Sequence, residues 1–397
     1  MHRAAGAERR ISAEAILQAG CCGMFFFLPV ATSPTVICGL LVLFVWLFSG
    51  RFLRDISAWR AADTALPVVL LILLPWVGLL YTPVPADGLP VALKSHYWLY
   101  AVACAPVVCG MRQRNLPIRG FLAGLFINSL VAILQFAGLV PLKKGLTTGL
   151  LGGSSAHIAF SLLLTTGILI SSFYFFRAGS RNERLFYGLL ITQYFATIGF
   201  VGGRSGYIAL ILLFPLVIHN IIGRRRMAVT LIACVVLGAV LFSFPVVRSR
   251  FAAAASDISR YQSGDINTSL GHRFHMWRIA LEEIRSHPVI GIGTSGFRQA
   301  WELHKADPLL PFYDHPHNSF LYQMVSFGIT GLIAFCWLLI ALLRKGWRFR
   351  DSAPGFSVLS FAAVFVVGSL SDTQLLPFAT AMALPLFTGI SEAIRDN

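Results

Sequence analysis

The chain has 397 residues, of which 56% are hydrophobic and 12% charged, and its mean hydropathy is +0.72. Soluble globular domains carry about 25% charged residues, so this composition excludes an ordinary soluble domain and indicates a membrane protein. The net charge of +15 would indicate a nucleic-acid partner in a soluble protein. Here most basic residues stand in short segments between apolar runs, where they report membrane topology, so we expect no nucleic acid.

Apolar runs recur along nearly the whole chain, and each is close to the roughly 20 residues that a helix needs to cross a bilayer. The first run passes directly into the second with no small-x-small cleavage site, so we interpret it as a span rather than a signal peptide. We predict an all-α polytopic membrane protein with about 12 transmembrane helices and one large, partly helical loop between helices 9 and 10. The predicted spans are residues 13–32, 34–50, 64–81, 95–110, 119–140, 156–176, 185–202, 206–222, 227–245, 318–343, 355–371 and 374–392.

These spans divide the chain into three predicted parts: residues 1–245 with helices 1–9, the loop domain 246–317, and residues 318–397 with helices 10–12. The seven cysteines all lie in or at the ends of apolar runs, and none lies in the loop domain. Disulfides and cysteine metal sites are therefore not expected.

The distribution of basic residues predicts the orientation in the membrane. Outside the loop domain, 20 Lys and Arg residues fall on one side of the predicted membrane and 4 on the other. Short basic segments stay in the cytoplasm, whereas long loops cross regardless of charge. Both termini are thus predicted to be cytoplasmic, and the loop domain to face outward, which in a bacterium means the periplasm. The basic segments are residues 1–10, 51–60, 112–119, 177–184, 224–226, 344–350 and 395.

A transporter is the alternative class for twelve spans. A major-facilitator-type carrier would place its long connection in the cytoplasm between two six-helix halves. The corresponding connection here, 177–184, is eight residues long. The asymmetry favours an outward-facing site over a carrier with two rocking halves.

Arg204 stands in the sequence Val-Gly-Gly-Arg-Ser-Gly (201–206), a tight turn between two predicted spans on the outward side. An arginine at this depth must reach water or an anion. Glycines let the backbone approach a ligand closely, and the next helix begins here with its N-terminus facing the same space. The combination suits phosphate; the alternative is an arginine whose head group extends to the membrane surface.

The loop domain contains a predicted amphipathic helix over residues 271–284. Arg273 heads a face that is otherwise apolar (Trp277, Ala280, Leu281 and Ile284). Its planar guanidinium matches phosphate oxygens, which makes it a candidate second anion clamp, with a solvated charge as the alternative. The following segment, 286–297, has three glycines but neither a preceding strand nor a Gly-Lys-Ser/Thr ending, so we interpret it as a structural turn with His287 at the helix end.

The most polar cluster of the chain, residues 314–319 (Asp-His-Pro-His-Asn-Ser), adjoins the tenth predicted span. A histidine at this boundary can be neutral near pH 7 and accept the proton of an attacking hydroxyl; His317 is the best candidate for such a base. His315 could support it, and Asn318 could orient its ring or cap the next helix. A metal site is disfavoured, because His-Pro-His cannot place both rings on one helix face and no HExxH-like partner occurs. A purely structural cap is the remaining alternative.

Two further outward positions could assist. Asp372 lies in the predicted turn between the last two spans, where capping of the twelfth helix is the favoured role. Lys143 and Lys144 form a small basic patch near the fifth span that could attract anionic headgroups or phosphorylated sugars.

Taken together, these features resemble the O-antigen ligase and polymerase superfamily of bacterial envelope glycosyltransferases. The resemblance rests on an arginine in a Gly-rich turn between spans, an Arg-x-x-x-Trp helix, a His-Pro-x-x-Gly-x-Gly segment and a closing His-x-His-Asn, in this order within residues 200–320. It implies a GT-C-like, metal-independent inverting transferase without cofactors that moves a glycan from an undecaprenyl-diphosphate carrier to an acceptor hydroxyl. On this resemblance Arg204 and Arg273 clamp the diphosphate and His317 is the base.

The resemblance leaves several activities open. Ligases attach the glycan to lipid A–core, whereas polymerases lengthen the carrier-linked chain. Protein-glycosylating relatives often have longer periplasmic parts. We expect an O-antigen ligase of the inner membrane that uses an undecaprenyl-diphosphate-linked O-polysaccharide donor, a lipid A–core acceptor and membrane lipid as partners. The alternatives are the polymerase and, from another class, a transporter or lipid flippase.

Overall fold

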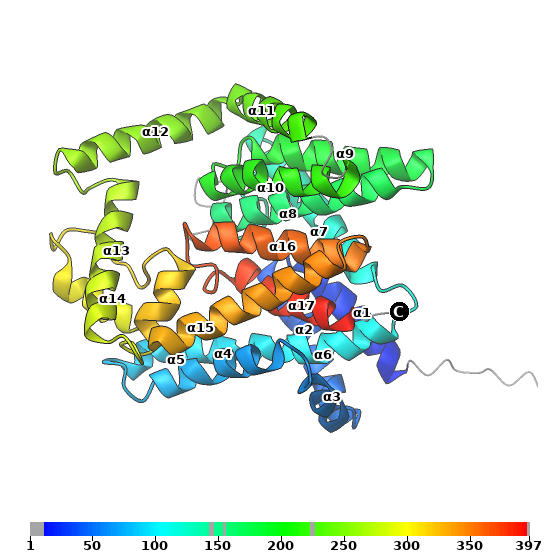
Figure 1. Cartoon of the computed structure of the whole chain (residues 1–397), viewed down its shortest axis with the longest axis horizontal. Helices are drawn as coiled ribbons and strands as arrows, with labels where there is room; N and C mark the ends of the chain where they lie inside the picture. The colour runs from blue at the N-terminus through cyan, green and yellow to red at the C-terminus, as the bar shows by residue number, and fades with distance from the viewer. Residues whose placement is uncertain (1–11, 143–146, 154–155, 223–226, 395–397) are drawn as a thin grey trace, which may run out of the picture.

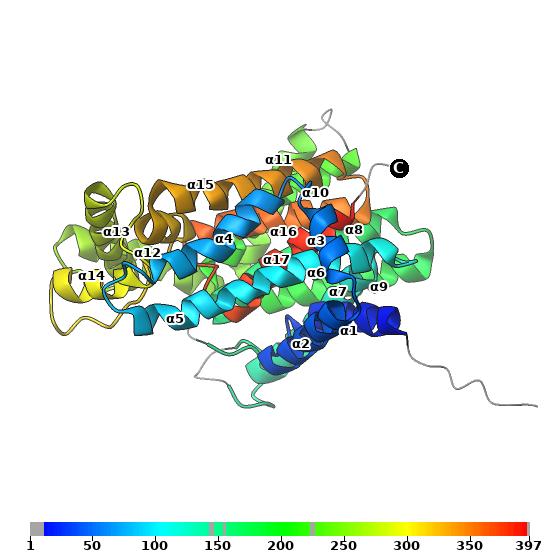
Figure 2. The same ribbon diagram turned by 90° about the horizontal axis from the view of Figure 1, so that it is seen from below.

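The structure is a computed structural model that describes residues 12–142, 147–153, 156–222 and 227–394. These residues form seventeen α-helices and one short 3-10 helix, and no β-strand occurs among them. Figure 1 and Figure 2, two views at right angles, both show most helices lying side by side in one bundle. The helices are α1 (Ala13–Phe27), α2 (Thr32–Phe48), α3 (Phe52–Trp59), α4 (Ala65–Gly78), α5 (Pro85–Leu93), η1 (Lys94–His96), α6 (Tyr97–Gly110), α7 (Leu116–Phe136), α8 (Ala156–Arg177), α9 (Arg181–Ile198), α10 (Arg204–Ile222), α11 (Met227–Ser243), α12 (Pro245–Gln262), α13 (Ser269–Ser286), α14 (Gly296–His304), α15 (Ser319–Arg348), α16 (Ala353–Ser369) and α17 (Phe378–Ala393).

Each of the twelve predicted apolar runs coincides with one helix, but their ability to cross a membrane differs. In the described parts of the chain, α7, α8 and α15 are long and apolar enough to span a bilayer. The bent pairs α2–α3 and α11–α12, with bends of 100° and 92°, raise the number to at most five. Others, such as α1 and α4, are shorter than a span requires. The chain is therefore an α-helical membrane protein, and the count of twelve spans stays a prediction.

Two of the predicted runs extend beyond the helices that form, and a proline lies near the end of each of these helices. The first run was expected over 13–32, but α1 ends at Phe27, shortly before Pro29. Similarly, the run 64–81 is shortened to α4, which has Pro75 in its last turn. The short helices α3 and α5 were not predicted, because neither carries an apolar run of membrane length.

Helix α8 lies at the centre of the bundle. It is buried over nearly its whole length and packs against α9, α10 and α16. Its hydroxyl side chains donate to backbone carbonyls, for example Thr165 to Ser161 and Gly206 at 3.0 Å each. Gly203 and Gly206 of the α10 turn face Ser161, where a side chain on either glycine would collide with it. Small residues thus let α10 approach α8 closely, as in other membrane helix pairs.

The predicted loop domain forms a small helical layer of its own. Figure 1 shows α12, α13 and α14 gathered at one end of the bundle, with the C-terminus at the opposite end. Met276 and Ile279 of α13 and Phe297 and Trp301 of α14 form a separate buried apolar cluster, which reaches Val325 of α15. The predicted helix over 271–284 is confirmed as α13, and this cluster fixes it against the bundle.

The glycine-rich segment between α13 and α14 serves as a structural turn, as predicted. His287 ends α13, and Gly291 and Gly293 adopt positive φ angles of 70° and 86°. The amides of Ile292 and Gly293 donate to the carbonyls of Val325 and Ser326 at 2.9 and 3.0 Å. These contacts dock the segment where Gly328 interrupts α15 (φ 63°, ψ −156°), so its amides bind helix carbonyls and are not available to a phosphate.

Candidate active site

Two turns that are far apart in the sequence meet at the loop-domain end of the bundle. One precedes α15 and carries His317; the other joins α16 to α17 and carries Asp372. Ser319 donates to the Asp372 carbonyl at 3.2 Å and accepts from the Gln374 amide at 2.9 Å. Asn318 caps α15 by accepting from two backbone amides, and its own amide donates to the Leu370 carbonyl at 3.1 Å. Of its two expected roles, Asn318 therefore takes the cap.

The side chains of His317 and Asp372 form a close hydrogen-bonded pair. The distance between His317 Nδ1 and Asp372 Oδ1 is 2.6 Å, and the aspartate is fully buried while the histidine side chain is 17% exposed. Burial raises the pKa of Asp372, but the hydrogen bond from His317 and the charges of His317, His315 and Arg273 outweigh it and lower the pKa to about 2. Because an ionised carboxylate only accepts, His317 donates through Nδ1, which leaves Nε2 unprotonated when the ring is neutral.

This pairing corrects the expected role of Asp372. Capping of the last helix was favoured from its place in a turn, but α17 begins at Phe378 after Pro377, with no side-chain cap. Asp372 instead accepts from His317 and from the Thr373 amide at 2.9 Å through Oδ1. Its Oδ2 is buried and has no hydrogen-bond partner among the described residues.

The backbone of His317 is strained. Its φ of 48° lies in the left-handed region, which costs a residue with a side chain about 1–3 kcal/mol. Surrounding contacts hold it there: its amide donates to His315 Nδ1 at 3.2 Å, and Trp277 of α13 donates to the Pro316 carbonyl at 2.9 Å. Strain of this kind is concentrated at functional sites, and here it sets the direction of the His317 ring.

His315 supports His317 in a neutral form. Burial and the charge of His317 lower its pKa to about 4, so its Nδ1 is free to accept the amide hydrogen bond. The two imidazole rings lie 4.2 Å apart, centroid to centroid. His315 is thus a positioning residue, which agrees with its expected supporting place.

His315, His317 and Asp372 are close enough to hold a metal ion, because one ligand atom from each lies within 4.8 Å of the others. Both Nδ1 atoms already hold hydrogen bonds, one to Asp372 and one from the His317 amide. Binding of Zn²⁺ would have to use other nitrogens or break these bonds, since a ligating nitrogen must present its lone pair. The hydrogen bonding favours a His–Asp dyad.

Arg204 and Arg273 are brought near each other by α10 and α13, and the charge of Arg273 reaches the dyad. Arg204 is the first residue of α10 and donates to Ser269, the first residue of α13, at 3.2 Å. The charge of Arg273, also on α13, acts on Asp372, on His315 and on Arg204. Both arginines are partly buried.

Two further basic residues, Arg250 and His157, join this group and were not singled out from the sequence. A side chain on Gly202 would come within 3.0 Å of the Arg250 guanidinium, and the charge of Arg250 acts on Arg204 and on His157. The charges of Arg273 and Asp372 also act on His157, which lies in the first turn of α8. Its buried Nδ1 has no hydrogen-bond partner in the described parts of the chain. Arg250 carries no sequence signal that separates it from Arg248, and His157 is a lone histidine at the head of an apolar run.

The resulting cluster is strongly cationic. In the part of the chain that the structure describes, none of Arg204, Arg250 and Arg273 forms an ion pair with a carboxylate within 4.0 Å. The charge of Asp257 acts on Arg204, and the Asp257 carboxylate accepts a hydrogen bond from the Leu270 amide at 3.3 Å. Three guanidinium groups without an ion-pair partner favour a polyanionic ligand such as a phosphate ester. Lys143 and Lys144, the predicted outer basic patch, lie outside the described residues.

Comparisons with known proteins relate part of this chain to a family. Residues 189–336 match the family model described as O-antigen ligase, which confirms the resemblance seen in the sequence. An uncharacterized protein of Haemophilus influenzae is 30% identical over 195 residues, 46% of this chain and 48% of that protein. The chain thus aligns with about half the length of this curated relative. The family match includes Arg204, Arg273 and His317, whereas Asp372 lies beyond it.

Proposed function

We propose that this chain, which belongs to the O-antigen ligase family through residues 189–336, is an O-antigen ligase. It would transfer an O-polysaccharide from undecaprenyl diphosphate to lipid A–core at the periplasmic face of the bacterial inner membrane. The observation that carries this proposal is the His317–Asp372 pair, 2.6 Å apart, beside three arginines that have no ion-pair partner among the described residues.

His317 is the proposed general base. With Nδ1 held by Asp372, Nε2 can accept the proton of the acceptor hydroxyl as the oxygen attacks the anomeric carbon. Buried Asp372 stabilises the imidazolium that forms and fixes the ring orientation. The buried aspartate of Ser-His-Asp hydrolases has the same role beside the catalytic histidine.

Arg204, Arg273 and Arg250 are proposed to bind the diphosphate. As the bond between the anomeric carbon and the diphosphate oxygen breaks, negative charge grows on the leaving group, and guanidinium groups stabilise it. A diphosphate that is stabilised in this way leaves without a general acid. The new carbon–oxygen bond forms on the opposite face of the sugar, so the configuration inverts, and the proton stays on His317 until it passes to solvent.

The membrane arrangement is part of the proposal. For the twelve predicted spans, cytoplasmic termini and a periplasmic site are supported by the unequal distribution of Lys and Arg residues, 20 against 4 outside the loop domain. Arg250 and Arg273 belong to α12 and α13, which lie at one end of the bundle (Figure 1). A lipid-linked donor at the membrane surface would meet the site there.

The polymerase of the same superfamily is the sister candidate, since it would use the same base and clamp with a carrier-linked acceptor. The matched family is described as O-antigen ligase, which favours the ligase. A transporter or flippase would need no general base, so the His–Asp pair favours a transferase over that class.

Deletion of the gene separates these functions. Long glycan chains that accumulate on the polyprenyl carrier would indicate a ligase, a core that bears a single repeat unit would indicate a polymerase, and absence of glycan from the periplasmic leaflet would indicate a flippase. In the complemented strain, a folded His317→Ala variant should form no polysaccharide-capped lipopolysaccharide. Undiminished capping in that strain would overturn the assignment of His317.

A further inference from the structure

A cavity of about 520 Å³ opens beside the turn that carries His317, and none of the three arginines lines it. Its volume lies within the range of small-ligand sites. Residues from α5, η1, α14, α15 and both site turns meet there, so the cavity joins the bundle to the loop domain. The charged and aromatic residues of its lining on which the argument depends are Asp87, Lys94, Arg298, Asp314, Tyr322 and Phe378.

The position of the cavity relates it to the candidate base. Ala156 lines it and directly precedes His157 of the cationic cluster, and His315 lines it and lies two residues before His317. The cavity therefore lies next to residues that surround the candidate base, while none of the three arginines lines it. An inverting displacement requires the acceptor to enter away from the leaving diphosphate, and a cavity that these arginines do not line suits that requirement.

The charges of the lining are balanced, which distinguishes the cavity from the arginine cluster. Asp87 and Arg298 form an ion pair of 2.8 Å, and the charge of Asp314 acts on Lys94. Two acidic and two basic groups leave no net charge for a phosphate to neutralise. Carboxylates, a lysine and aromatic rings instead offer hydrogen-bond partners and apolar faces, which suit the hydroxyls and ring faces of an uncharged sugar.

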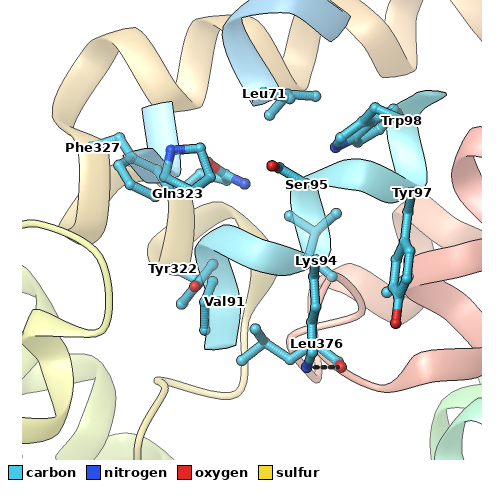
Figure 3. A pocket seen from close by; sticks show the side chains of 13 residues that line it. Leu71, Val91, Lys94, Ser95, Tyr97, Trp98, Tyr322, Gln323, Phe327 and Leu376 are labelled. Atoms are coloured by element: carbon cyan, nitrogen blue, oxygen red, sulfur yellow. Dashed lines mark hydrogen bonds between the residues drawn. The ribbon is translucent and has the colours of Figure 1, made fainter. Parts of the chain in front are cut away.

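Buried polar atoms without hydrogen-bond partners among the described residues lie in a smaller space that adjoins the cavity. Figure 3 shows the adjoining space of about 60 Å³, which shares Val91, Lys94, Tyr322 and Leu376 with the larger cavity. Lys94 points to the Leu376 carbonyl, with a hydrogen bond of 3.1 Å, so its ammonium group has two further hydrogens to donate. The Tyr322 hydroxyl and Gln323 Oε1 are buried without hydrogen-bond partners in the parts of the chain that are described. Buried groups of this kind are normally satisfied, so a ligand or water belongs here.

We propose that the 520 Å³ cavity is the acceptor site, which binds an uncharged sugar of the acceptor glycan and directs one of its hydroxyls past His315 to His317. The inference rests on the proposed glycosyl transfer but holds for a lipid A–core or a carrier-linked acceptor. Lys94 and Asp314 are its expected hydrogen-bonding residues, and Tyr322 and Phe378 supply its aromatic walls.

Gly152→Trp tests the site by filling it. Gly152 lines the cavity, its φ is not positive, and no atom of the described residues lies within 4 Å of where its Cβ would be, so a side chain there points into space that these residues leave open. Gly238→Trp is the matched control, since Gly238 of α11 has equally open surroundings and does not line the cavity. The readouts are transfer kinetics in detergent, with lipid A–core and a polyprenyl-diphosphate glycan, and the thermal shift produced by undecaprenyl diphosphate.

We expect Gly152→Trp to raise the acceptor KM at least about tenfold while the thermal shift with undecaprenyl diphosphate stays at the wild-type value. Gly238→Trp should match the wild type in both. Asp314→Asn, which keeps the size of the side chain, should raise the acceptor KM about three- to tenfold, as expected for the loss of one hydrogen bond.

Other outcomes separate this inference from the proposed function. A wild-type acceptor KM in Gly152→Trp would overturn the acceptor site, and loss of the undecaprenyl diphosphate shift in that variant would reassign the cavity to the donor. If the wild-type protein transferred no glycan to either acceptor class, the proposed function itself would fail. If Gly152→Trp did not fold, Asp314→Asn would decide, and an unchanged acceptor KM there would overturn the site.

Discussion

Replacement of Asp372 by asparagine removes the charge behind the candidate base while keeping the shape of the side chain. The His317–Asp372 bond is 2.6 Å long and the aspartate is fully buried, so the interaction is a charge-assisted hydrogen bond shielded from water. Such bonds are worth about 1.5–3 kcal/mol, which corresponds to a fall of roughly 10- to 150-fold in rate when the interaction stabilises the transition state. We expect this fall in kcat, with an unchanged donor KM.

The assay is a double-mutant cycle in purified protein, with transfer rates for the wild type, Asp372→Asn, His317→Ala and the double variant. If Asp372 acts through His317, the double variant should be no slower than His317→Ala alone. Asp351→Asn is the control, because Asp351 is an exposed carboxylate that pairs with Arg177 at 3.0 Å, away from the site. A folded Asp372→Asn protein with a rate within twofold of the wild type would refute the reasoning.

The remaining predictions concern the anion clamp, acid stability, metal and the loop domain. Arg204→Ala and Arg273→Ala should each lower kcat/KM for the donor about 10- to 150-fold, and replacement by lysine should restore the rate only in part. Arg278→Ala is the control and should not lower it, because Arg278 is exposed and pairs with Glu282. Equal losses in all three variants would contradict a specific clamp. The pKa of Asp372 falls from 3.8 to about 2 in the folded protein, so its ionised form contributes roughly 2 kcal/mol of stability above pH 4. This contribution is lost as the pH falls towards 2. A series of thermal melts at decreasing pH should show this loss of stability in the wild type and not in Asp372→Asn. Added chelator should leave the transfer rate of the purified protein unchanged, and inhibition that Zn²⁺ or Mg²⁺ reverses would show that His315, His317 and Asp372 hold a metal. The excised loop domain 246–317 should not transfer glycan even when folded, because it lacks Arg204 and Asp372, and activity of this fragment would contradict the composite site.

The parts of the site that the sequence reveals are those with a strong local pattern. Arg204 stands among glycines at a helix start, Arg273 heads the apolar face of α13, and His317 lies in the most polar stretch of the chain. Each pattern reflects a local physical requirement, such as helix periodicity or the cost of a charge near the membrane, and the structure confirms the helix starts at Arg204 and near Arg273.

Pairings across long sequence distances escape this reasoning. Asp372 is 55 residues from His317, and an aspartate in a turn before a helix is more often a cap, so the sequence favours the wrong role. Arg250 belongs to α12, which is bent by 92° from α11, and this bend determines where Arg250 lies. A pattern of apolar residues does not encode the direction of a bend. The short helix α3 and the glycine-induced break in α15 are hidden for the same reason, since tertiary contacts determine them.

The family match covers only part of the machinery that the structure assembles. Residues 189–336 supply Arg204, Arg250, Arg273 and His317, but the anion behind His317 comes from the α16–α17 turn. The strained backbone of His317 depends on this assembly: His315 holds its amide, α13 holds Pro316, and Ser319 ties the turn to residues 372–374. A strain of about 1–3 kcal/mol persists only where several contacts impose it together. The direction of the His317 ring is therefore a property of the folded bundle and loop domain combined, and a change in the α16–α17 turn should lower the rate without altering any residue of the matched segment.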